Sequence, residues 1–390
     1  MSVTETTVSS PLPPGKYYFS GNEALAEGAI AAGCNYYAGY PITPSSEIME
    51  RLAARFAGLE GRVFIQMEDE LASICSVIGA VWAGAKGMTA TSGPGFSLMQ
   101  EAIGYAALTE TPLVLADIQR AGPGTGQATK VASGDLMQAK WGSHGDYQPI
   151  ALCPWSVQEM YELTITAFNL AETYRVPVFL LGEEAVGHLQ ERLDIPAANR
   201  VARRHYQPGA PPFGHPDPAG VPSMPAFGQG EKLLVTGSTH DEYGFRRTDD
   251  PAAHARLVAR LNDKILQHRD RIVSTRSYRL EDAEIAIVAY GFTARSAWLA
   301  VDELRRAGKK AGLLRLRTIW PFAAAEIAAL GSSVRQIFVP VPPADRRPDH
   351  LPGNHHPGGT GAVAWPATWK NTCARAPTAP RSVPAAATAS

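Results

Sequence analysis

Between residues 21 and about 190 the sequence alternates apolar strand signals with helical segments, and this alternation constrains the fold more than any other feature. Short runs rich in branched and aromatic residues predict strands over 34–40, 62–67, 87–92, 112–119, 149–155 and 177–183. Helical patterns lie between them, over 21–33, 45–59, 69–85, 96–110 and 157–176. Ser156 and Glu159 predict a capping box at the start of the last of these helices. Apolar strands that are each separated by a helix form a parallel sheet covered on both faces. We therefore predict an α/β fold.

A second, shorter α/β pattern follows a stretch rich in proline and glycine. Residues 195–230 predict an extended linker, 231–245 a short strand with a polar loop, and 252–275 a charged helix. Strand, helix and strand signals then recur over 284–291, 294–308 and 310–322. After Pro340 the sequence loses its periodicity and becomes rich in proline, so we expect a disordered or aberrant tail, such as a frameshift produces.

These patterns divide the chain into five segments. We expect an N-terminal arm, a parallel-sheet domain, a linker with a connecting segment, a second and smaller α/β domain that is incomplete, and the tail. Their expected bounds are 1–20, 21–194, 195–280, 281–340 and 341–390.

Charge and hydropathy argue against several classes of partner. The net charge of −1 and the lack of a Lys/Arg-rich run give no electrostatic case for binding nucleic acid. The polar N-terminus does not resemble a signal peptide, and no stretch reaches the roughly 18 apolar residues of a membrane span. We expect a cytoplasmic protein that binds neither nucleic acid nor a membrane.

The cysteines and a histidine cluster give little support for a metal site. Cys34, Cys75, Cys153 and Cys373 are far apart and form no CxxC, which argues against a disulfide framework, a zinc site or an iron–sulfur cluster held by this chain alone. Several histidines gather near residues 350–356 without positioned partners. We expect no metal ligands in this chain.

Polar side chains follow the ends of four neighbouring predicted strands. Thr43, Glu68, Ser92 and Arg120 each lie at or shortly after the end of a predicted strand. In parallel sheets ligands gather beyond the carboxyl ends of the strands, so we expect these residues to share one site. At Thr43 two interpretations stay open, an N-cap with Pro44 in the first helical turn or a side chain that faces a ligand.

Two further motifs are each ambiguous when taken alone. Glu68, Asp69 and Glu70 can simply decorate a helix N-terminus, where acidic groups are favoured. The motif SGPG, residues 92–95, is either a tight turn or a place where the backbone approaches a ligand closely. An acidic residue that ends one strand and TSGPG at the end of the next form the pattern of pyrimidine-binding domains in thiamine diphosphate enzymes.

The ordered set of motifs resembles a specific family. Five motifs follow one another along the chain: GNEALAEGAIAAGCNYYAGYPITPSSEIME, QMEDELASICSVIGAVWAGAKGMTATSGPGFSLMQEAIGYA, TPLVLADIQRAGPGTGQATK, GDLMQAKWGSHGDY and VTGSTHDEYG. Over about residues 18–340 the chain is similar to the alpha subunits of 2-oxoacid:ferredoxin oxidoreductases, particularly the 2-oxoglutarate type. The resemblance implies a thiamine diphosphate-binding fold with a transketolase C-terminal-like second domain.

The resemblance also implies an activity and a set of partners. Such enzymes convert a 2-oxoacid and coenzyme A to an acyl-CoA and carbon dioxide while reducing ferredoxin. A beta subunit supplies Mg²⁺, the diphosphate half of the cofactor site and a [4Fe-4S] cluster, in an (αβ)₂ assembly. This chain fits the alpha role because it carries neither a GDG diphosphate motif nor a cluster-binding set of cysteines. We expect it to be inactive without the beta subunit.

The family pattern assigns roles to the residues at the strand ends. Glu68 matches the glutamate that hydrogen-bonds to the aminopyrimidine ring; the burial expected there would raise its pKa, whereas a helix N-terminus would lower it, and both alternatives stay open. Thr43 and Arg120 match substrate contacts, with Arg120 holding the 2-oxoacid carboxylate. Ser92, Gly93 and Gly95 match the cofactor-binding turn, whereas Asp69 and Glu70 are expected to face solvent or a subunit interface.

A dicarboxylate substrate needs further donors for its distal carboxylate. Lys130, Lys140 and His144 lie downstream of Arg120 and are candidates, with a solvated helix face as the alternative. His240, in STHDEYG, is given no catalytic role.

Three alternatives stay open at the level of the whole chain. It can belong to a pyruvate or branched-chain enzyme of the same family, to a non-oxidative acetolactate-type enzyme, or to a scaffold without catalysis. An enzyme of the acetolactate type would need a diphosphate-binding motif in the same chain, and this sequence lacks one.

Overall fold

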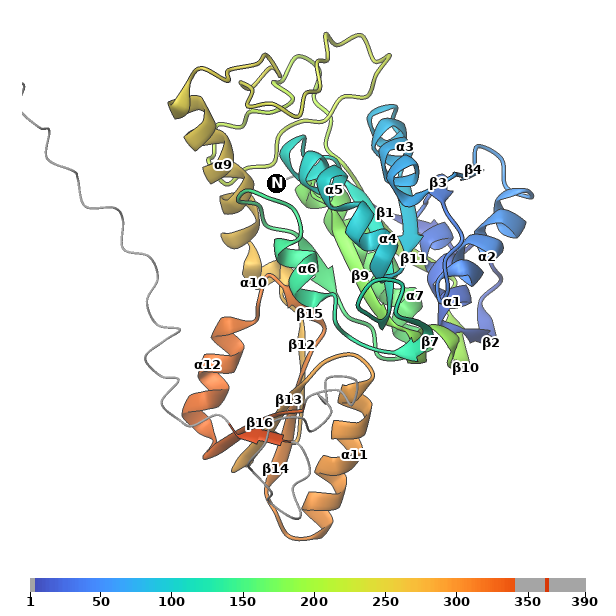
Figure 1. Cartoon of the computed structure of the whole chain (residues 1–390), viewed down its shortest axis with the longest axis vertical. Coiled ribbons are helices and arrows are strands. Elements are labelled where there is room, and N and C mark those ends of the chain that lie inside the picture. The colour runs from blue at the N-terminus through green and yellow to red at the C-terminus, as the bar shows by residue number, and fades with distance from the viewer. Residues whose placement is uncertain (1–3, 341–361, 365–390) are drawn as a thin grey trace, which may run out of the picture.

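The computed structural model describes residues 4–340 and 362–364, and places the predicted parallel sheet at the centre of the larger lobe (Figure 1). Six strands of that sheet run parallel, while β15 and β7 pair antiparallel with β8 and β6. In spatial order the strands are β15 (Thr318–Trp320), β8 (Ile150–Leu152), β9 (Val178–Glu183), β6 (Leu113–Ala121), β5 (Gly87–Thr91), β3 (Tyr36–Gly39) and β4 (Val63–Gln66), with β7 (Gln127–Val131) beside β6.

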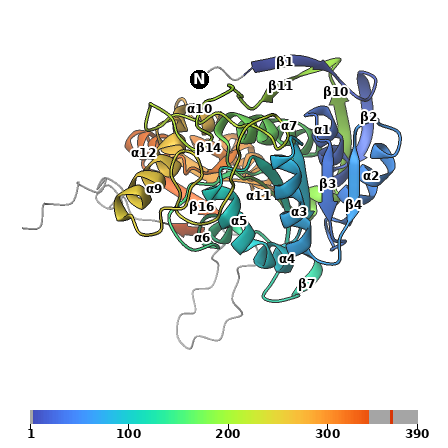
Figure 2. The ribbon, with the colours of Figure 1, turned by 90° about the horizontal axis from the view of Figure 1, so that it is seen from above.

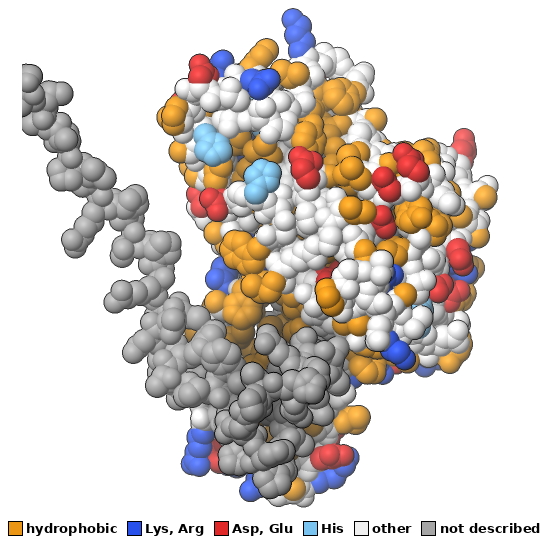
Figure 3. Space-filling model, viewed as in Figure 1, with side chains coloured by type: hydrophobic (Ala, Val, Ile, Leu, Met, Phe, Trp, Pro, Cys, Tyr) orange, Lys and Arg blue, Asp and Glu red, His pale blue; other side chains and the backbone are white. Residues whose placement is uncertain are grey.

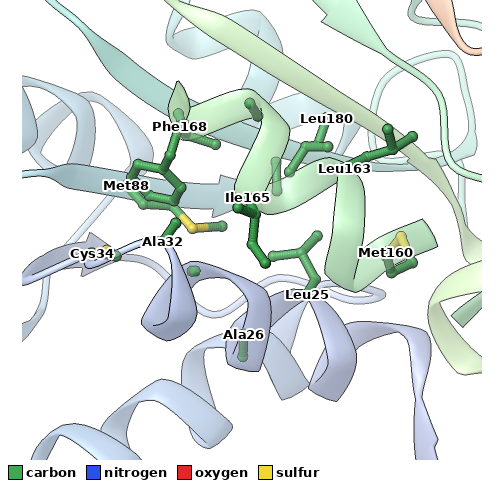
Figure 4. Packing of buried hydrophobic residues seen from close by; sticks show 14 of the residues in the cluster. Leu25, Ala26, Ala32, Cys34, Met88, Met160, Leu163, Ile165, Phe168 and Leu180 are labelled. Carbon is green, nitrogen blue, oxygen red and sulfur yellow. The ribbon is translucent and has the colours of Figure 1, made fainter. Parts of the chain in front are cut away.

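One face of this sheet is covered by α1 (Gly21–Ala31), α2 (Ser46–Phe56) and α7 (Val157–Tyr174). The small residues of α1 let it approach α7 closely: a Cβ on Gly28 would lie 2.5 Å from the carbonyl oxygen of Tyr161. Leu25 of α1 meets Ile165 of α7 in the buried layer between helices and sheet (Figure 4). This packing explains why the helix over 21–33 is apolar around most of its circumference.

The opposite face is covered by α3 (Glu70–Trp82), α4 (Gly93–Leu98) and α5 (Gln100–Leu108). Successive side chains of a strand point to opposite faces, so β6 contributes to both cores. Val114 and Ala116 pack in the first layer and Leu113 and Leu115 in the second. Burial on both faces accounts for the nearly continuous apolar run in this strand.

The second sheet lies below the first in Figure 1 and is flanked by α11 (Thr293–Arg306) and α12 (Ala324–Ser333). β13 pairs in parallel with β14 and β16, while β12 and β17 pair antiparallel at the edges. The order is β12 (Thr275–Tyr278), β14 (Ala311–Leu316), β13 (Ile285–Ala289), β16 (Gln336–Pro340) and β17 (Ala362–Ala364).

The expected N-terminal arm and part of the expected linker form two antiparallel ladders. β1 (Thr4–Ser9) pairs with β11 (Ala198–Arg203), and β2 (Gly15–Ser20) pairs with β10 (Gln190–Ile195). Seen from above, β1 and β11 run along the rim of the larger lobe (Figure 2). The short helix α8 (Glu184–His188) connects β9 to β10.

The charged helix predicted over 252–275 is α9 (Pro251–Leu266) followed by α10 (Arg269–Ile272). A buried ion cluster attaches α9 to the larger lobe. The Glu110 carboxylate, which is fully buried, accepts hydrogen bonds from Arg260 at 2.7 and 2.8 Å and from Lys264 at 2.7 Å.

Four local predictions are wrong. The segment 96–110 is not one helix, because α4 begins at Gly93 and a break at Met99 separates it from α5. Residues 231–238 form no strand. The segment 310–322 divides into β14 and β15, which belong to different sheets. At the start of α7, Ser156 accepts from the backbone of Glu159, but the Glu159 carboxylate binds Arg315 instead of completing a capping box.

Other predictions lie beyond what the structure describes. The tail 341–390 is outside the described residues except for β17, and so are Cys373 and the histidines near 350–356. Within residues 4–340 and 362–364, no helix is both long enough and apolar enough to span a membrane.

Candidate active site at the carboxyl edge of the large sheet

Arg120 and Thr43 lie together at the edge where β3 and β6 end. The Arg120 guanidinium is 8% exposed; it donates through Nη1 to the backbone carbonyl of Thr43 at 2.7 Å and through Nη2 to that of Thr125 at 2.8 Å. Its Nε atom is buried without a partner among the described residues. The guanidinium therefore keeps donor capacity for a ligand while it holds two loops in place.

The structure contradicts the capping role that was one interpretation of Thr43. Helix α2 begins at Ser46 and its N-cap is Ser45, so Thr43 and Pro44 precede the helix. The Ser45 hydroxyl donates to the carbonyl of Ile42 at 2.9 Å and makes no capping bond to the helix. Thr43 therefore belongs to the loop at the sheet edge.

The expected burial of Glu68 is wrong, and so is the expected exposure of Glu70. Glu68 is exposed, because it precedes Asp69, the N-cap whose side chain accepts from the backbone of Ala72 at 2.7 Å. Glu70 opens α3 and is only 5% exposed. Burial raises the pKa of Glu70 above that of an exposed carboxyl; the charge of Asp69 adds to this effect and that of Arg120 opposes it.

The sequence did contain a signal for Glu70. The buried positions of α3 recur every three or four residues, and Glu70 is in phase with Ser73, Ile74 and Val77 whereas Glu68 lies before the helix. Because residues at this spacing share one face of a helix, the apolar stripe extended backwards reaches Glu70.

The SGPG turn meets the Glu70 carboxyl directly. A Cβ on Gly95 would lie 2.1 Å from the Thr91 hydroxyl oxygen and 2.4 Å from Oε1 of Glu70, so only glycine leaves room for that carboxyl. Ser92 is the N-cap of α4, and its hydroxyl is buried with no hydrogen-bond partner among the described residues. The turn thus combines a close backbone approach with a polar atom that a ligand can satisfy.

The three candidates for a distal carboxylate occupy different surroundings. Lys130 and His144 are exposed. Lys140 is 6% exposed, donates to Oε1 of Gln148 and lies 5.8 Å from the ring of Trp320. Burial lowers the pKa of Lys140 to about 8. No hydrogen bond in the described part of the chain joins any of them to Arg120.

His240 is buried, and of the described cysteines Cys34 and Cys153 are buried while Cys75 is exposed. Nδ1 of His240 lies 2.9 Å from the carbonyl oxygen of Ser238, and the ring packs edge-on against Phe213 at 4.6 Å between centroids. Cys34, Cys75 and Cys153 form no disulfide. Among the described residues no group of three His, Cys, Asp or Glu side chains could hold a metal ion.

Exposed apolar side chains surround the sheet edge. Tyr40 follows β3, Leu71 adjoins Glu70 and Val131 lies on the strand that pairs with Arg120; they are 39%, 45% and 42% exposed. Met137 and Trp141 on α6 (Leu136–Trp141) are each 61% exposed. Hydrophobic side chains gather over the face that carries α4–α6 (Figure 3).

Residues 27–260 match the thiamine diphosphate-binding family of pyruvate flavodoxin/ferredoxin oxidoreductases. The chain belongs to this family. Residues 283–341 match core domain II of pyruvate:ferredoxin oxidoreductases. The predicted family and fold class are thereby confirmed, and they agree with the two sheets described above.

Curated relatives and a solved structure of this oxidoreductase family are similar over most of the chain. The 2-oxoglutarate synthase subunit KorA of Methanothermobacter thermautotrophicus is 52% identical over 83% of this chain and 87% of that protein. The ketoisovalerate oxidoreductase subunit VorB of Methanothermobacter marburgensis is 41% identical over 80% of this chain and 81% of that protein.

The solved structure is 2-oxoglutarate:ferredoxin oxidoreductase from Magnetococcus marinus with 2-oxoglutarate, coenzyme A and succinyl-CoA bound. It is 31% identical with a TM-score of 0.79, over 84% of this chain. The present chain spans 58% of the length of that structure's chain.

Proposed function

We propose that this chain is the alpha subunit of a thiamine diphosphate-dependent 2-oxoacid:ferredoxin oxidoreductase that acts on 2-oxoglutarate. The reaction converts 2-oxoglutarate and coenzyme A to succinyl-CoA and carbon dioxide while ferredoxin is reduced. The observation that carries the proposal is the buried carboxyl of Glu70, which lies against Gly95 of the SGPG turn and whose pKa is affected by the Arg120 guanidinium. The choice of 2-oxoglutarate is supported by the KorA relatives.

Glu70, rather than Glu68, takes the role of the cofactor glutamate in this proposal. Thiamine diphosphate supplies, when bound, the carbanion chemistry that decarboxylation of a 2-oxoacid requires. A buried carboxyl with a raised pKa can share a proton with the aminopyrimidine ring nitrogen, which an exposed one beside bulk water does poorly. Ser92, Gly93 and Gly95 bind the same ring in this proposal: the Ser92 hydroxyl has no partner among the described residues, and the lack of a side chain at Gly95 leaves room for the Glu70 carboxyl.

Arg120 orients the substrate in this proposal. Its planar guanidinium binds a carboxylate through two parallel N–H groups and stays charged at all physiological pH values. Two of its N–H groups hold the Thr43 and Thr125 loops, and the buried Nε is free among the described residues. The 2-oxoacid carboxylate therefore takes the remaining donors, with Thr43 at the side of the same pocket.

The remaining components belong to a partner in this proposal. A beta subunit brings Mg²⁺, the diphosphate half of the site and a [4Fe-4S] cluster, and it covers the exposed apolar side chains of Tyr40, Leu71 and Val131 in an (αβ)₂ assembly. We also propose that the functional division of the chain follows the segments predicted from sequence, with 21–194 and 281–340 as its two domains.

The test is anaerobic viologen reduction by this chain co-purified with its beta partner, with coenzyme A and either 2-oxoglutarate, pyruvate or 2-oxoisovalerate. Glu70→Gln and Glu68→Gln form a matched pair, because they remove the same charge two residues apart. We expect activity with 2-oxoglutarate that falls at least a hundredfold in Glu70→Gln and less than threefold in Glu68→Gln.

Each other outcome has a distinct meaning. Loss of activity in Glu68→Gln alone would return the cofactor role to Glu68. Activity confined to pyruvate or 2-oxoisovalerate would assign the chain to another branch of the family. A stable complex that oxidises none of the three acids would favour the alternative that this chain is a scaffold without catalysis.

A further inference from the structure

Two carboxyls that the proposed mechanism does not use, one fully buried and one half-buried, lie beside the SGPG turn. Asp117 on β6 is fully buried, and Asp135 directly precedes α6 with its Oδ2 atom buried. Both oxygens of Asp117 and Oδ2 of Asp135 are buried without a hydrogen-bond partner among the described residues. Burial, and then the nearby Asp135 carboxyl, raise the pKa of Asp117. Carboxylate oxygens only accept hydrogen bonds, so the two groups can satisfy each other only when one of them carries a proton.

No cation balances these carboxyls. Neither forms an ion pair with a lysine or arginine of the described residues, and both Asp117 oxygens lack a protein donor in good hydrogen-bond geometry. The backbone N–H of Gly93, the first residue of α4, is the nearest donor to Asp117. Two ionised carboxylates close together, one of them fully buried, would repel each other without compensation from a cation.

The backbone on both sides of the pair is fixed. The N–H of Asp135 donates to Oε1 of Gln119 at 3.1 Å, and the Ser133 hydroxyl donates to Oε1 of Glu183 at 2.5 Å. A Cβ on Gly93 would lie 3.8 Å from Oδ2 of Asp135. The pair therefore joins β6, the segment before α6 and the start of α4.

We propose that Asp117 and Asp135 share one proton and act together as positioning residues that hold the Ser92–Gly95 turn against the sheet edge. This inference rests on the proposed function for its catalytic consequence, but the shared proton itself does not. The pair then carries a single negative charge, and its hydrogen bond fixes the distance between β6 and the segment before α6. Gly93 and Ser92 are thereby held where Gly95 meets Glu70.

The direction of the pH dependence follows from the surroundings of the pair. The titratable groups nearby are the two carboxyls themselves and Glu183 on β9, which is bonded to Ser133; burial raises the pKa of Glu183 as well as that of Asp117. The folded chain therefore binds protons that the unfolded chain releases. The contribution of the pair to stability is greatest at acidic pH and declines as the pH rises toward the folded pKa.

The test compares asparagine and alanine at both positions in the complex with the beta partner. Asp135→Asn keeps the net charge, because its amide N–H can donate to Asp117 in place of the shared proton. Asp146→Asn, an exposed residue just after α6, is the matched control. We expect Asp135→Asn to retain activity within threefold of wild type. Asp135→Ala should lose at least tenfold in activity and in apparent affinity for thiamine diphosphate.

A second readout does not depend on turnover. In infrared spectra at neutral pH, the C=O band of a protonated carboxylic acid should be present in wild type and Asp146→Asn, and weaker in both Asp117→Asn and Asp135→Asn. An unchanged band in Asp117→Asn and Asp135→Asn would overturn the proposal that the two carboxyls share a proton. If asparagine proved as damaging as alanine while the band behaved as expected, the positioning role would be refuted. An inactive wild-type complex would count against the proposed function, and the infrared comparison would still decide the proton.

Discussion

Replacing Glu110 with glutamine should lower the free energy of unfolding by about 3–5 kcal/mol. The carboxylate is fully buried and accepts three charge-assisted hydrogen bonds, two from Arg260 and one from Lys264, at 2.7–2.8 Å. Glutamine removes the negative charge and leaves both cations buried, with Arg175 nearby as a third. Loss of one partner from a buried ion pair costs about 3–5 kcal/mol, whereas an exposed pair is worth about 0–1 kcal/mol.

The effect should also depend on pH. Burial alone would raise the pKa of Glu110, but Arg260 and Lys264 outweigh it and hold that pKa well below its usual range. A carboxyl whose pKa is lowered in the folded state stabilises the fold at pH values above its pKa in the unfolded chain, which is about 4.3. This stabilisation is lost as the pH falls toward the folded pKa. The difference between wild type and Glu110→Gln should therefore be constant from pH 7 to about pH 5 and shrink at lower pH.

Urea unfolding followed by tryptophan fluorescence measures this difference. Glu281→Gln is the matched control, because Glu281 is exposed and forms no ion pair within the described residues. A change below about 1 kcal/mol in Glu110→Gln would refute the reasoning, as would an equal change in the control. A small change in Glu110→Gln would mean that Arg260 and Lys264 reach water once the Glu110 carboxylate is removed.

Three further predictions concern single residues. Gly95→Ala should abolish viologen reduction while circular dichroism stays native-like, because its Cβ would displace Glu70; activity near wild type would contradict this. Burial lowers the pKa of Lys140 to about 8, so this residue should make wild-type stability rise as the pH increases from 8 toward the unfolded value of about 10.4. Urea midpoints of Lys140→Met should rise less over this range, with the remaining rise due to Lys86 and Lys264, whose pKa values are also lowered to about 8. Arg315→Met should cost about 3 kcal/mol in thermal unfolding, since it leaves the buried Glu159 carboxylate with only Arg317 and the backbone N–H of Trp155, each at 3.3 Å; an unchanged midpoint would show that these two partners suffice.

The parallel sheet and the residues at its edge could be predicted because their signals are local. Each strand of the large lobe is a short apolar run, and each helix shows its own periodicity, so the alternation specified a sheet covered on both faces. The carboxyl ends of parallel strands meet at one edge, which is why Thr43 and Arg120 were expected together and are joined by a hydrogen bond.

Contacts between distant segments were not predictable in this way. The run 310–322 has one continuous strand signal, yet β14 pairs within the second sheet and β15 crosses to the first. The Ser156–Glu159 spacing indicates a capping box, but Arg315 competes for the same carboxylate from the other lobe. A charged partner more than 150 residues away overrides a local preference worth about 1 kcal/mol.

The sequence by itself determined the fold class, the family and the edge of the sheet that carries the site. It did so because hydrophobic periodicity and motif order are properties of the chain that need no knowledge of its neighbours in space. The tertiary structure showed that Glu70 is buried and Glu68 exposed, which the periodicity of α3 only indicates and residue type does not. It likewise placed Asp135 near the buried Asp117, because elements distant in the sequence build that environment together.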